Sequence, residues 1–505
     1  MIVDYEYIKQ DLKVSYISDS GHIKMKSYKW PNPQKFIICD DDDRDKDGKY
    51  VTWDGCSVKK VYTRRPDRYS VYDFLDNLPQ EEQDDVFKYV EADIYFIDIE
   101  NEILDTKPTP HLAEGAIQSI SIVNKNKVLV MGIEDLSNTD ISSIEEDINN
   151  YFIKFGTTYE FKFIKYRNEY DMIFNFFNKY VPKMAVLTGW NFTEYDWVYL
   201  INRARKIGID PSVSSFTRVL RPPFKRDNKT GKDKESYCEM PAHRLIIDYM
   251  ELYQKWDTTI KVKESDSLDF VSYNILKLRK VNYEGTLKTL AKQDYKKFIY
   301  YNAVDSILVQ KIHEKTKWID ILYGISTLSR IRVLDAYSTL PVTEGILRKK
   351  LKKERNIILC RLENDSMQQN LVDDAEKAVK GGWVKDPVKG KMATWVSCYD
   401  FASLYPTTMR MFNISADSYK GVLSPDKKYA IFNDHRVDLE PTDIILLNGT
   451  VFKNETGVVN QVMTDIYGDR KKYKGMMNKD REDIEEYKRE LKQAEEELMV
   501  EFDII

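Results

Sequence analysis

Asp400 lies where an apolar segment gives way to a turn, a place at which a carboxylate can hold a metal ion. The preceding residues 394–399 are rich in β-branched and aromatic side chains, which predicts a strand that ends at Asp400. The amides that follow, through Leu404 and Tyr405, are then free to face an anion, as turn amides do around a phosphate. A carboxylate for Mg²⁺ beside amides for a phosphate indicates nucleotide chemistry, although an acidic strand end capped by a turn is the simpler alternative.

A second set of acids begins with Asp98 and Glu100. Residues 95–100 are typical of an apolar strand, and alternate residues of a strand project from one face, so these two carboxylates should lie side by side. Two neighbouring carboxylates repel each other unless a cation joins them. On its own, the pair is also compatible with a solvated strand end.

Further acids follow later in the chain. Asp196 comes after a strand predicted at 184–187, and a helix is predicted directly after it. Tyr301 and Asp305 are four residues apart in a helical pattern and therefore share a helix face. Four carboxylates and one phenol could then converge on one site.

The composition indicates a large protein with several domains. The chain has 505 residues, of which 42% are hydrophobic and 31% charged, and a net charge of −5, which predicts about three or four domains. Its 5 cysteines lack metal-ligand spacing and favour free thiols in a reducing compartment. The first residues do not resemble a signal peptide and no apolar run reaches about 18 residues, so we expect a cytoplasmic protein, in the host cell cytoplasm if it is viral. Net acidity does not exclude DNA binding, because phosphate contacts depend on local Lys and Arg.

The segment Asp400-Phe-Ala-Ser-Leu-Tyr-Pro406, continued by Arg410 and Asn413-Ile-Ser415, resembles motif A of the family B DNA polymerases. The order of the surrounding segments is most similar to the T-even-like phage branch. The resemblance implies that Asp400 is one of two palm aspartates that hold two catalytic Mg²⁺ or Mn²⁺ ions. It also implies that the Tyr405 ring blocks a ribose 2′-OH and that the nucleoside triphosphate is contacted by Ser403, Leu404 and Tyr405.

The segments around Asp98, Asp196 and Asp305 resemble, in this order, the Exo I, Exo II and Exo III motifs of DnaQ-like 3′-to-5′ proofreading exonucleases. The resemblance implies that Tyr301 orients the attacking water and that Asn191 contacts DNA. It further implies two Mg²⁺ or Mn²⁺ ions, held by Asp98, Glu100, Asp196 and Asp305. Two ions about 4 Å apart can generate a hydroxide, polarise the phosphodiester and stabilise the leaving oxygen without a covalent nucleophile.

Two weaker similarities concern DNA and nucleotide contacts. Residues 380–384 resemble the Tyr-x-Gly-Gly element that contacts DNA between the two active sites, here through Gly381 and Gly382, and a plain turn is an equal alternative. A long helix is predicted at 462–501, and its Arg470 and Lys474 resemble the fingers residues that meet the triphosphate. A solvated charged face is the alternative there.

Two loops also carry recognisable patterns. Residues 225–236 predict an exposed hairpin, similar to one that helps part primer from template in the related polymerases, with a solvated loop as the alternative. The run from Asp43 to Asp54 fits the start of an EF-hand loop but ends in Asp rather than Glu. A hairpin of two strands, at 35–39 and 50–53, explains that run better.

The expected fold is α/β and multidomain, with an RNase H-like (DnaQ-like) exonuclease domain whose mixed sheet is flanked by helices. The divisions that the resemblance implies are an N-terminal domain at 1–92, the exonuclease at 93–317, a return segment packing on the N-terminal domain at 318–366, a partial palm at 367–458 and the first arm of the fingers at 459–505.

The polymerase site is incomplete by this comparison. Neither the Lys-x-x-x-Asn-Ser-x-Tyr-Gly of the fingers nor the Asp-Thr-Asp of the palm occurs between Met409 and Ile505. We therefore expect the N-terminal portion of a split DNA polymerase that binds primer-template DNA and deoxynucleoside triphosphates and proofreads by itself. A second chain would supply the missing motifs and the thumb, and a sliding clamp would be reached through that chain. The alternatives are a stand-alone exonuclease with a palm remnant as a DNA platform, and a non-enzymatic DNA-binding scaffold.

Overall fold

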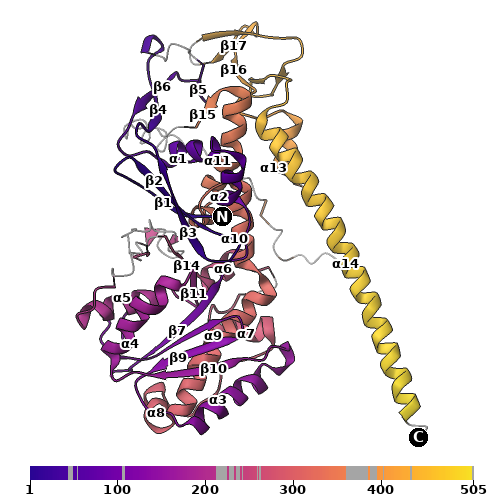
Figure 1. Ribbon diagram of the computed structural model, residues 1–505. Coiled ribbons are helices and arrows are strands. Elements are labelled where there is room, and N and C mark those ends of the chain that lie inside the picture. The colour runs from indigo at the N-terminus through magenta and orange to yellow at the C-terminus, as the bar shows by residue number, and fades with distance from the viewer. Residues whose placement is uncertain are drawn as a thin grey trace. The chain divides into compact units, whose positions relative to one another are not determined.

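The computed structural model describes residues 1–43, 49–53, 55–104, 108–211, 225–226, 233–234, 239–241, 243–258, 260, 263–359, 385–386, 390, 395–401, 403–432 and 435–502 (Figure 1). For 225–226, 233–234 and 495–502 only the backbone is described. The chain forms two compact units, residues 1–33 with 74–343 and residues 34–73 with 344–505. Helices α1 (Arg68–Asp76) and α11 (Thr339–Lys350) each run from one unit into the other. The five-part division predicted from the sequence stays a prediction.

A six-stranded mixed sheet forms the centre of the first unit. Its strand order is β10-β9-β8-β7-β11-β14. The pairs β7–β8 and β8–β9 are antiparallel, whereas β9–β10, β7–β11 and β11–β14 are parallel. The strands are β7 (Ile94–Asn101), β8 (Ile117–Asn124), β9 (Lys127–Gly132), β10 (Glu160–Lys165), β11 (Val186–Gly189) and β14 (Leu245–Asp248). The prediction of an α/β protein with a mixed sheet is confirmed.

Helices pack against this sheet, and the most buried of them is α9 (Tyr295–Thr316), which lies along β7 and β8 (Figure 1). Nearly every residue of α9 from Phe298 to His313 is buried, which is typical of a helix enclosed on all sides. The other helices around the sheet are α3 (Asn138–Tyr151), α4 (Glu169–Asn175), α5 (Asp196–Lys206), α6 (Tyr249–Trp256), α7 (Leu268–Leu276), α8 (Leu287–Gln293) and α10 (Trp318–Ser329).

Small polar side chains hold α9 against β8. Ser119 Oγ donates to Asn302 Oδ1 (3.1 Å), and Ser121 Oγ donates to the Asn302 carbonyl oxygen (3.0 Å). Ser121 also bonds the Ser306 hydroxyl. Both β8 serines are fully buried. Because serine is small, the helix can approach the sheet closely, and these bonds fix which turn of α9 faces β7.

The remainder of the first unit is a second, smaller sheet. Strands β1 (Ile2–Ile8), β2 (Asp11–Ile17) and β3 (Ile23–Lys29) pair antiparallel in chain order, and α2 (Gln80–Phe87) contacts β2.

The second unit contains a five-stranded antiparallel sheet and two helices that follow the motif A residues. The strand order is β18-β17-β16-β20-β19. These strands are β16 (Tyr419–Leu423), β17 (Tyr429–Phe432), β18 (His435–Asp438), β19 (Ile444–Ile445) and β20 (Thr450–Phe452). The helices are α13 (Leu404–Met411) and α14 (Val458–Phe502), the long helix predicted at 462–501. Shorter pairs join β4 (Gln34–Ile38) to β6 (Val58–Tyr62) and β5 (Val51–Thr52) to β15 (Ile357–Ile358).

Two sequence predictions in this unit are wrong. The described residues 395–400 form no strand, and most of their side chains are exposed. A strand needs neighbours that take its backbone hydrogen bonds, and no described strand pairs with this segment. The predicted hairpin of 35–39 and 50–53 is also wrong, because β4 pairs with β6 while β5 pairs with β15. Strands rather than helices flank the EF-hand-like run, which disfavours a Ca²⁺ loop.

The predicted hairpin at 225–236 is present in the backbone. Strand β12 (Lys225–Arg226) pairs antiparallel with β13 (Asp233–Lys234). Its role in strand separation stays a prediction. Within the described ranges, no helix is both long and apolar enough to span a bilayer.

His313 on α9 provides a pH-dependent test of how this helix is buried. Its Nδ1 lies 3.2 Å from the Tyr249 hydroxyl, and burial lowers the pKa of the imidazole to about 3 from 6.5. The folded protein therefore keeps His313 neutral, whereas the unfolded chain takes up a proton below pH 6.5. Stability should be lost as the pH falls, by about 2 kcal/mol between pH 6.5 and 5. Between pH 6.5 and 5, the unfolding free energy of the wild type should fall by that amount relative to the unfolding free energy of His313→Phe. A difference between the two proteins that does not change with pH would contradict the burial of a neutral His313.

Candidate active site

Three carboxylates meet at one end of β7. Asp98 and Glu100 project from β7, and Asp305 projects from α9, which packs along that strand. One oxygen from each of the three carboxylates lies within 4.8 Å of the others. Strand alternation brings the first two together, and the β8–α9 contacts bring the third. The structure therefore assembles three of the four predicted ligands, and their role stays a prediction.

Asp196 lies beside this group at the first residue of α5. Its Oδ1 accepts a hydrogen bond from the backbone N of Ile99 (3.3 Å), the residue between the two β7 acids. Asp196 lines the same cavity as the other three acids. Tyr301 and Asn191 line it as well. Asn191 adopts a left-handed backbone conformation (φ 58°), one that Asn tolerates better than most residues, in the turn between β11 and α5.

Burial makes the charged forms of these acids unfavourable. It raises the pKa of Asp98 to about 7, and the nearby charge of Asp305 adds to the effect. Burial likewise raises the pKa values of Glu100 and Asp196 far above their ordinary range and that of Asp305 more moderately. At neutral pH these carboxylates can all ionise only if positive charge enters the site.

The donor set fits a hard divalent cation. All the convergent donors are carboxylate oxygens, which are the ligands that Mg²⁺ and Mn²⁺ favour. Asp305 Oδ1 is buried, and no described residue forms a hydrogen bond with it. An unsatisfied buried carboxylate oxygen is costly, so the site is better satisfied when a cation binds there.

Lys280 supplies positive charge that the sequence did not reveal. Its Nζ lies 2.6 Å from Asp305 Oδ2 and 4.9 Å from the centre of the Tyr301 ring. Burial alone would lower the pKa of Lys280, but the charge of Asp305 and its neighbours raises it overall. Lys280 precedes α8 in an irregular segment, where no spacing links it to the acids.

Asn302 was also missed, although its spacing offered a signal. It precedes Asp305 by three residues on α9 and therefore shares that helix face. Its Nδ2 donates to Asp98 Oδ2 (2.7 Å), while its other atoms are held by Ser119 and Ser121. Asn302 thus fixes the orientation of the Asp98 carboxylate.

The cavity that contains these groups has a volume of about 610 Å³. Besides the acids, the lining includes a largely apolar set of side chains, formed by Ile103, Leu104, Pro108, Trp190, Leu268 and Leu287. A cavity of this size and lining suits a ligand with both charged and flat apolar parts.

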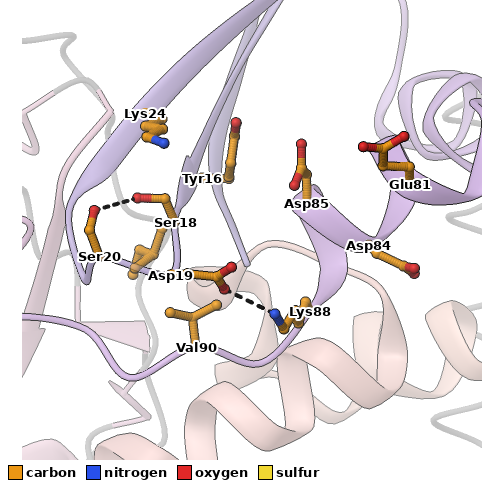
Figure 2. Close-up of a pocket in the computed structure, with 11 residues that line it drawn as sticks. Tyr16, Ser18, Asp19, Ser20, Lys24, Glu81, Asp84, Asp85, Lys88 and Val90 are labelled. Carbon is orange, nitrogen blue, oxygen red and sulfur yellow. Dashed lines mark hydrogen bonds and ion pairs between the residues drawn. The ribbon is translucent and has the colours of Figure 1, made fainter.

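A second cavity, of about 700 Å³, lies between β2, β3 and α2 (Figure 2). It is polar, but its charged groups are partly paired. Asp19 forms an ion pair with Lys88 (3.0 Å), and Asp85 lies 3.9 Å from Lys26. Ser18 and Ser20 bond each other (2.9 Å). This arrangement offers no convergent set of buried donors comparable to the acids around Asp98.

The predicted nucleotide residues are exposed. Asp400 is exposed, Leu404 is 50% and Tyr405 81% exposed, and Ser403 adopts a left-handed conformation (φ 52°) before α13. Among the described residues, no second carboxylate joins Asp400 in a metal-binding group.

Four further residues were predicted to contact the nucleotide or the DNA. Arg470 and Lys474 are exposed, one turn apart on α14. Gly381 and Gly382 lie outside the described residues.

Comparison with known proteins identifies two regions. The family model "DNA polymerase family B, exonuclease domain" matches residues 71–271, which include Asp98, Glu100 and Asp196. The family model "DNA polymerase family B" matches residues 332–495, which include Asp400, Arg470 and Lys474.

Similar proteins include the DNA-directed DNA polymerase of Escherichia phage RB69, 27% identical over 62% of this chain and 33% of the relative. The DNA-directed DNA polymerase of Enterobacteria phage T4 is 26% identical over 62% of this chain and 34% of the relative. The DNA polymerase delta catalytic subunit of Schizosaccharomyces pombe is 22% identical over 63% of this chain and 28% of the relative. The chain spans about a third of the length of these two phage relatives. With exonuclease and polymerase regions both matched, the chain belongs to the family B DNA polymerases.

Proposed function

We propose that this chain is the N-terminal portion of a split family B DNA-directed DNA polymerase and that it carries a 3′-to-5′ proofreading exonuclease. The convergence of Asp98, Glu100 and Asp305 in one cavity is the observation that carries the exonuclease proposal. The mixed sheet flanked by helices supports an RNase H-like (DnaQ-like) exonuclease fold. A stand-alone exonuclease is the second candidate, favoured by the exposure of Asp400 without a partner acid among the described residues.

The acids of the cavity would hold two Mg²⁺ or Mn²⁺ ions, through Asp98, Glu100, Asp196 and Asp305. Bound there, the ions would lower the pKa of a water molecule and stabilise charge that develops on the phosphodiester. Asn302 keeps the Asp98 carboxylate oriented. Burial raises the pKa of Tyr301 far above neutral, so its hydroxyl stays protonated and can donate a hydrogen bond to the attacking water.

The apolar lining of the cavity supports a preference for unpaired 3′ ends. Apolar side chains such as Leu104 and Leu268 can contact the face of a base without reading its edge. A terminal nucleotide must leave its duplex partner to enter, at a cost of a few kcal/mol that is smallest for a mismatch. Discrimination by pairing rather than by sequence is what proofreading requires.

The second half of the proposal concerns polymerisation. Asp400, Ser403, Leu404 and Tyr405 would form the motif A part of a nucleotide site, and Gly381 and Gly382 would contact DNA. Helix α14 carries an exposed apolar stripe at spacings of three, four and seven residues, formed by Ile466, Tyr473, Met477, Ile484, Tyr487 and Leu491. Such a stripe is typical of a helix that packs on another helix. We infer that a second chain supplies that helix, the missing motifs and the thumb, and a route to a sliding clamp.

Asp98→Ala with Glu100→Ala should abolish 3′-to-5′ degradation of single-stranded DNA by the purified chain. We expect a loss of several orders of magnitude in rate with Mg²⁺ or Mn²⁺, because the metal-bound charge stabilises the transition state. Rates should be measured on a 5′-labelled oligonucleotide. Glu146→Ala, which removes an exposed acid on α3, is the control and should keep the wild-type rate. If the double variant hydrolysed DNA at the wild-type rate, the cavity around Asp98 and Glu100 would not be the exonuclease active site.

Lys280→Met should increase the affinity of the chain for Mn²⁺ several-fold, since the lysine and a metal ion compete for Asp305. In EDTA the variant should melt at a lower temperature than wild type, because the buried carboxylates lose their resident cation. Calorimetric titration and thermal melts provide the two readouts. Lys292→Met, an exposed lysine on α8, serves as the matched control. Equal Mn²⁺ affinity in wild type and Lys280→Met would refute the competition.

The chain alone should not extend a primer with Mg²⁺ and all four deoxynucleotides, because no second carboxylate among the described residues joins Asp400. Addition of a chain carrying the missing motifs and thumb should restore synthesis. In that mixture Asp400→Ala should abolish extension and leave exonuclease activity at the wild-type level, and Tyr405→Ala should admit ribonucleotides. Primer extension by the homogeneous 505-residue chain would rule out a split polymerase site.

A further inference from the structure

Helix α5 carries a row of hydrogen-bond donors on one face. Tyr199, Asn202, Arg203 and Lys206 are spaced by three, one and three residues, which places them along one side of a helix. Each of them donates to a backbone carbonyl oxygen of the connection between β7 and β8. This connection comprises residues 102–116, of which 102–104 and 108–116 are described. The row therefore ties the connection to the helix.

The bonded carbonyls follow one another along the connection. The bonds run from Asn202 Nδ2 to Pro110 (3.0 Å), from Lys206 Nζ to Leu112 (3.1 Å), from Arg203 Nη1 to Ala113 (3.1 Å) and Glu114 (3.0 Å), and from the Tyr199 hydroxyl to Gly115 (2.7 Å). Carbonyl groups of irregular backbone have no strand or helix partner, so side-chain donors must satisfy them. Ala113 is also fully buried. These contacts fix the path of the connection.

Arg203 is the centre of this contact. Its Nε and Nη2 donate to the two carboxylate oxygens of Glu169 on α4, each at 2.8 Å. Glu169 Oε1 also accepts from the amide of Ile117 (2.6 Å), the first residue of β8. Figure 1 shows α4 beside α5. A planar guanidinium can pair with a carboxylate through two bonds and still reach carbonyl oxygens, whereas a lysine ammonium lacks that geometry.

The same connection supplies part of the apolar lining of the acidic cavity, through Ile103, Leu104 and Pro108. Bonds lie on both sides of this lining. On one side, the Glu102 amide donates to the Ala116 carbonyl oxygen (2.7 Å), and a Cβ at Gly115 would overlap the Glu102 carbonyl oxygen. On the other side, Pro110 is bonded by α5. Fixing the connection therefore fixes this part of the lining.

Helix α5 also belongs to the other end of the cavity. It begins at Asp196, one of the proposed metal ligands. Tyr195, directly before it, lines the cavity and donates to Asn101 Oδ1 (3.1 Å). The Tyr195 ring stacks on the ring of Tyr199, with centroids 5.8 Å apart. One helix thus carries both a proposed metal ligand and the row of donors that holds the lining.

We propose that Arg203, paired with Glu169, is a positioning residue that sets where the apolar lining stands relative to the metal-binding acids. Its side chain lies outside the cavity lining and acts through the connection that it bonds. By this account the lining holds the bases of an entering 3′ end, while the acids hold its phosphate. This consequence for the substrate rests on the proposed exonuclease function, whereas the tie between α5 and the connection does not.

Hydrogen exchange of the full chain tests the tie without DNA or metal. In Arg203→Met the amides of residues 108–117 should exchange about tenfold faster than in the wild type, because the segment opens locally. The amides of α9 should keep their wild-type rates, which excludes a general loss of stability. Arg205→Met, which breaks an ion pair with Glu239 on another face of α5, is the matched control and should exchange like the wild type. Unchanged exchange of 108–117 in Arg203→Met would refute the tie.

Kinetics on single-stranded DNA test the consequence. A contact that is equal in the ground state and the transition state lowers KM without changing kcat. Arg203→Met should therefore raise KM for a 5′-labelled oligonucleotide about tenfold and keep kcat within about twofold. The Mn²⁺ affinity, measured by calorimetric titration, should stay at the wild-type value. Arg203→Lys should give an intermediate KM, because its ammonium can pair with Glu169 but cannot replace all the bonds of the guanidinium.

Glu169→Gln is a second variant if Arg203→Met fails to fold. It keeps the volume of the side chain and an acceptor for the Ile117 amide, but it sets an NH₂ group against Arg203 Nη2. KM should rise as in Arg203→Met. A wild-type KM in the folded variants, or a fall in kcat at unchanged KM, would overturn the proposal and leave the exonuclease in place. A wild-type chain without hydrolysis would instead refute the exonuclease and, with it, the role of the lining.

Discussion

Burial of like charges is the constraint on which the first unit depends. Asp98, Glu100 and Asp305 approach within 4.8 Å in a cavity where water solvates them poorly, and each has a raised pKa for that reason. A fold gains nothing from such an arrangement, since buried charges of one sign repel and lose hydration. Lys280 relieves part of the repulsion, and Asn302 satisfies one oxygen. The scaffold of β7, β8 and α9 must supply the stability that these acids cost, and it does so through a helix that is buried along most of its length and through two buried serines.

Much of this site could be predicted from local periodicity. Alternation on a strand placed Asp98 beside Glu100, and helical spacing placed Tyr301 on the face of Asp305, because both relations involve only a few residues of one element. Which elements then meet is a tertiary question, and the resemblance to a known family answered it in advance. Lys280 had neither kind of signal: it lies in an irregular segment and reaches Asp305 only after α9 has packed. Asn302 was within reach of the helical spacing, but an asparagine in an apolar helix more often satisfies the backbone than a carboxylate.

In the second unit, tertiary contacts decided more of the structure than local sequence patterns could predict. Residues 394–399 have strand-forming composition, yet the described residues 395–400 are exposed and unpaired by any described strand, since propensity cannot replace a hydrogen-bonding neighbour. The start of α14 could not be located by a local capping residue, because its caps come from Asn413, Ser415 and Asp417. In both places the deciding interaction joins residues far apart in sequence. Motif A and the long helix were therefore predictable as elements, and the contact between them was not.

The most direct test of the central claim is the position of bound metal in the exonuclease cavity. Crystals of the chain soaked in Mn²⁺ would give anomalous diffraction that locates the ions independently of any activity. We expect two peaks within coordination distance of the carboxylates, one of them in contact with Asp98, Glu100 and Asp305, and none in crystals of the Asp98→Ala, Glu100→Ala variant. Anomalous density confined to surface acids, with the cavity empty at saturating Mn²⁺, would contradict a metal-dependent exonuclease at this site.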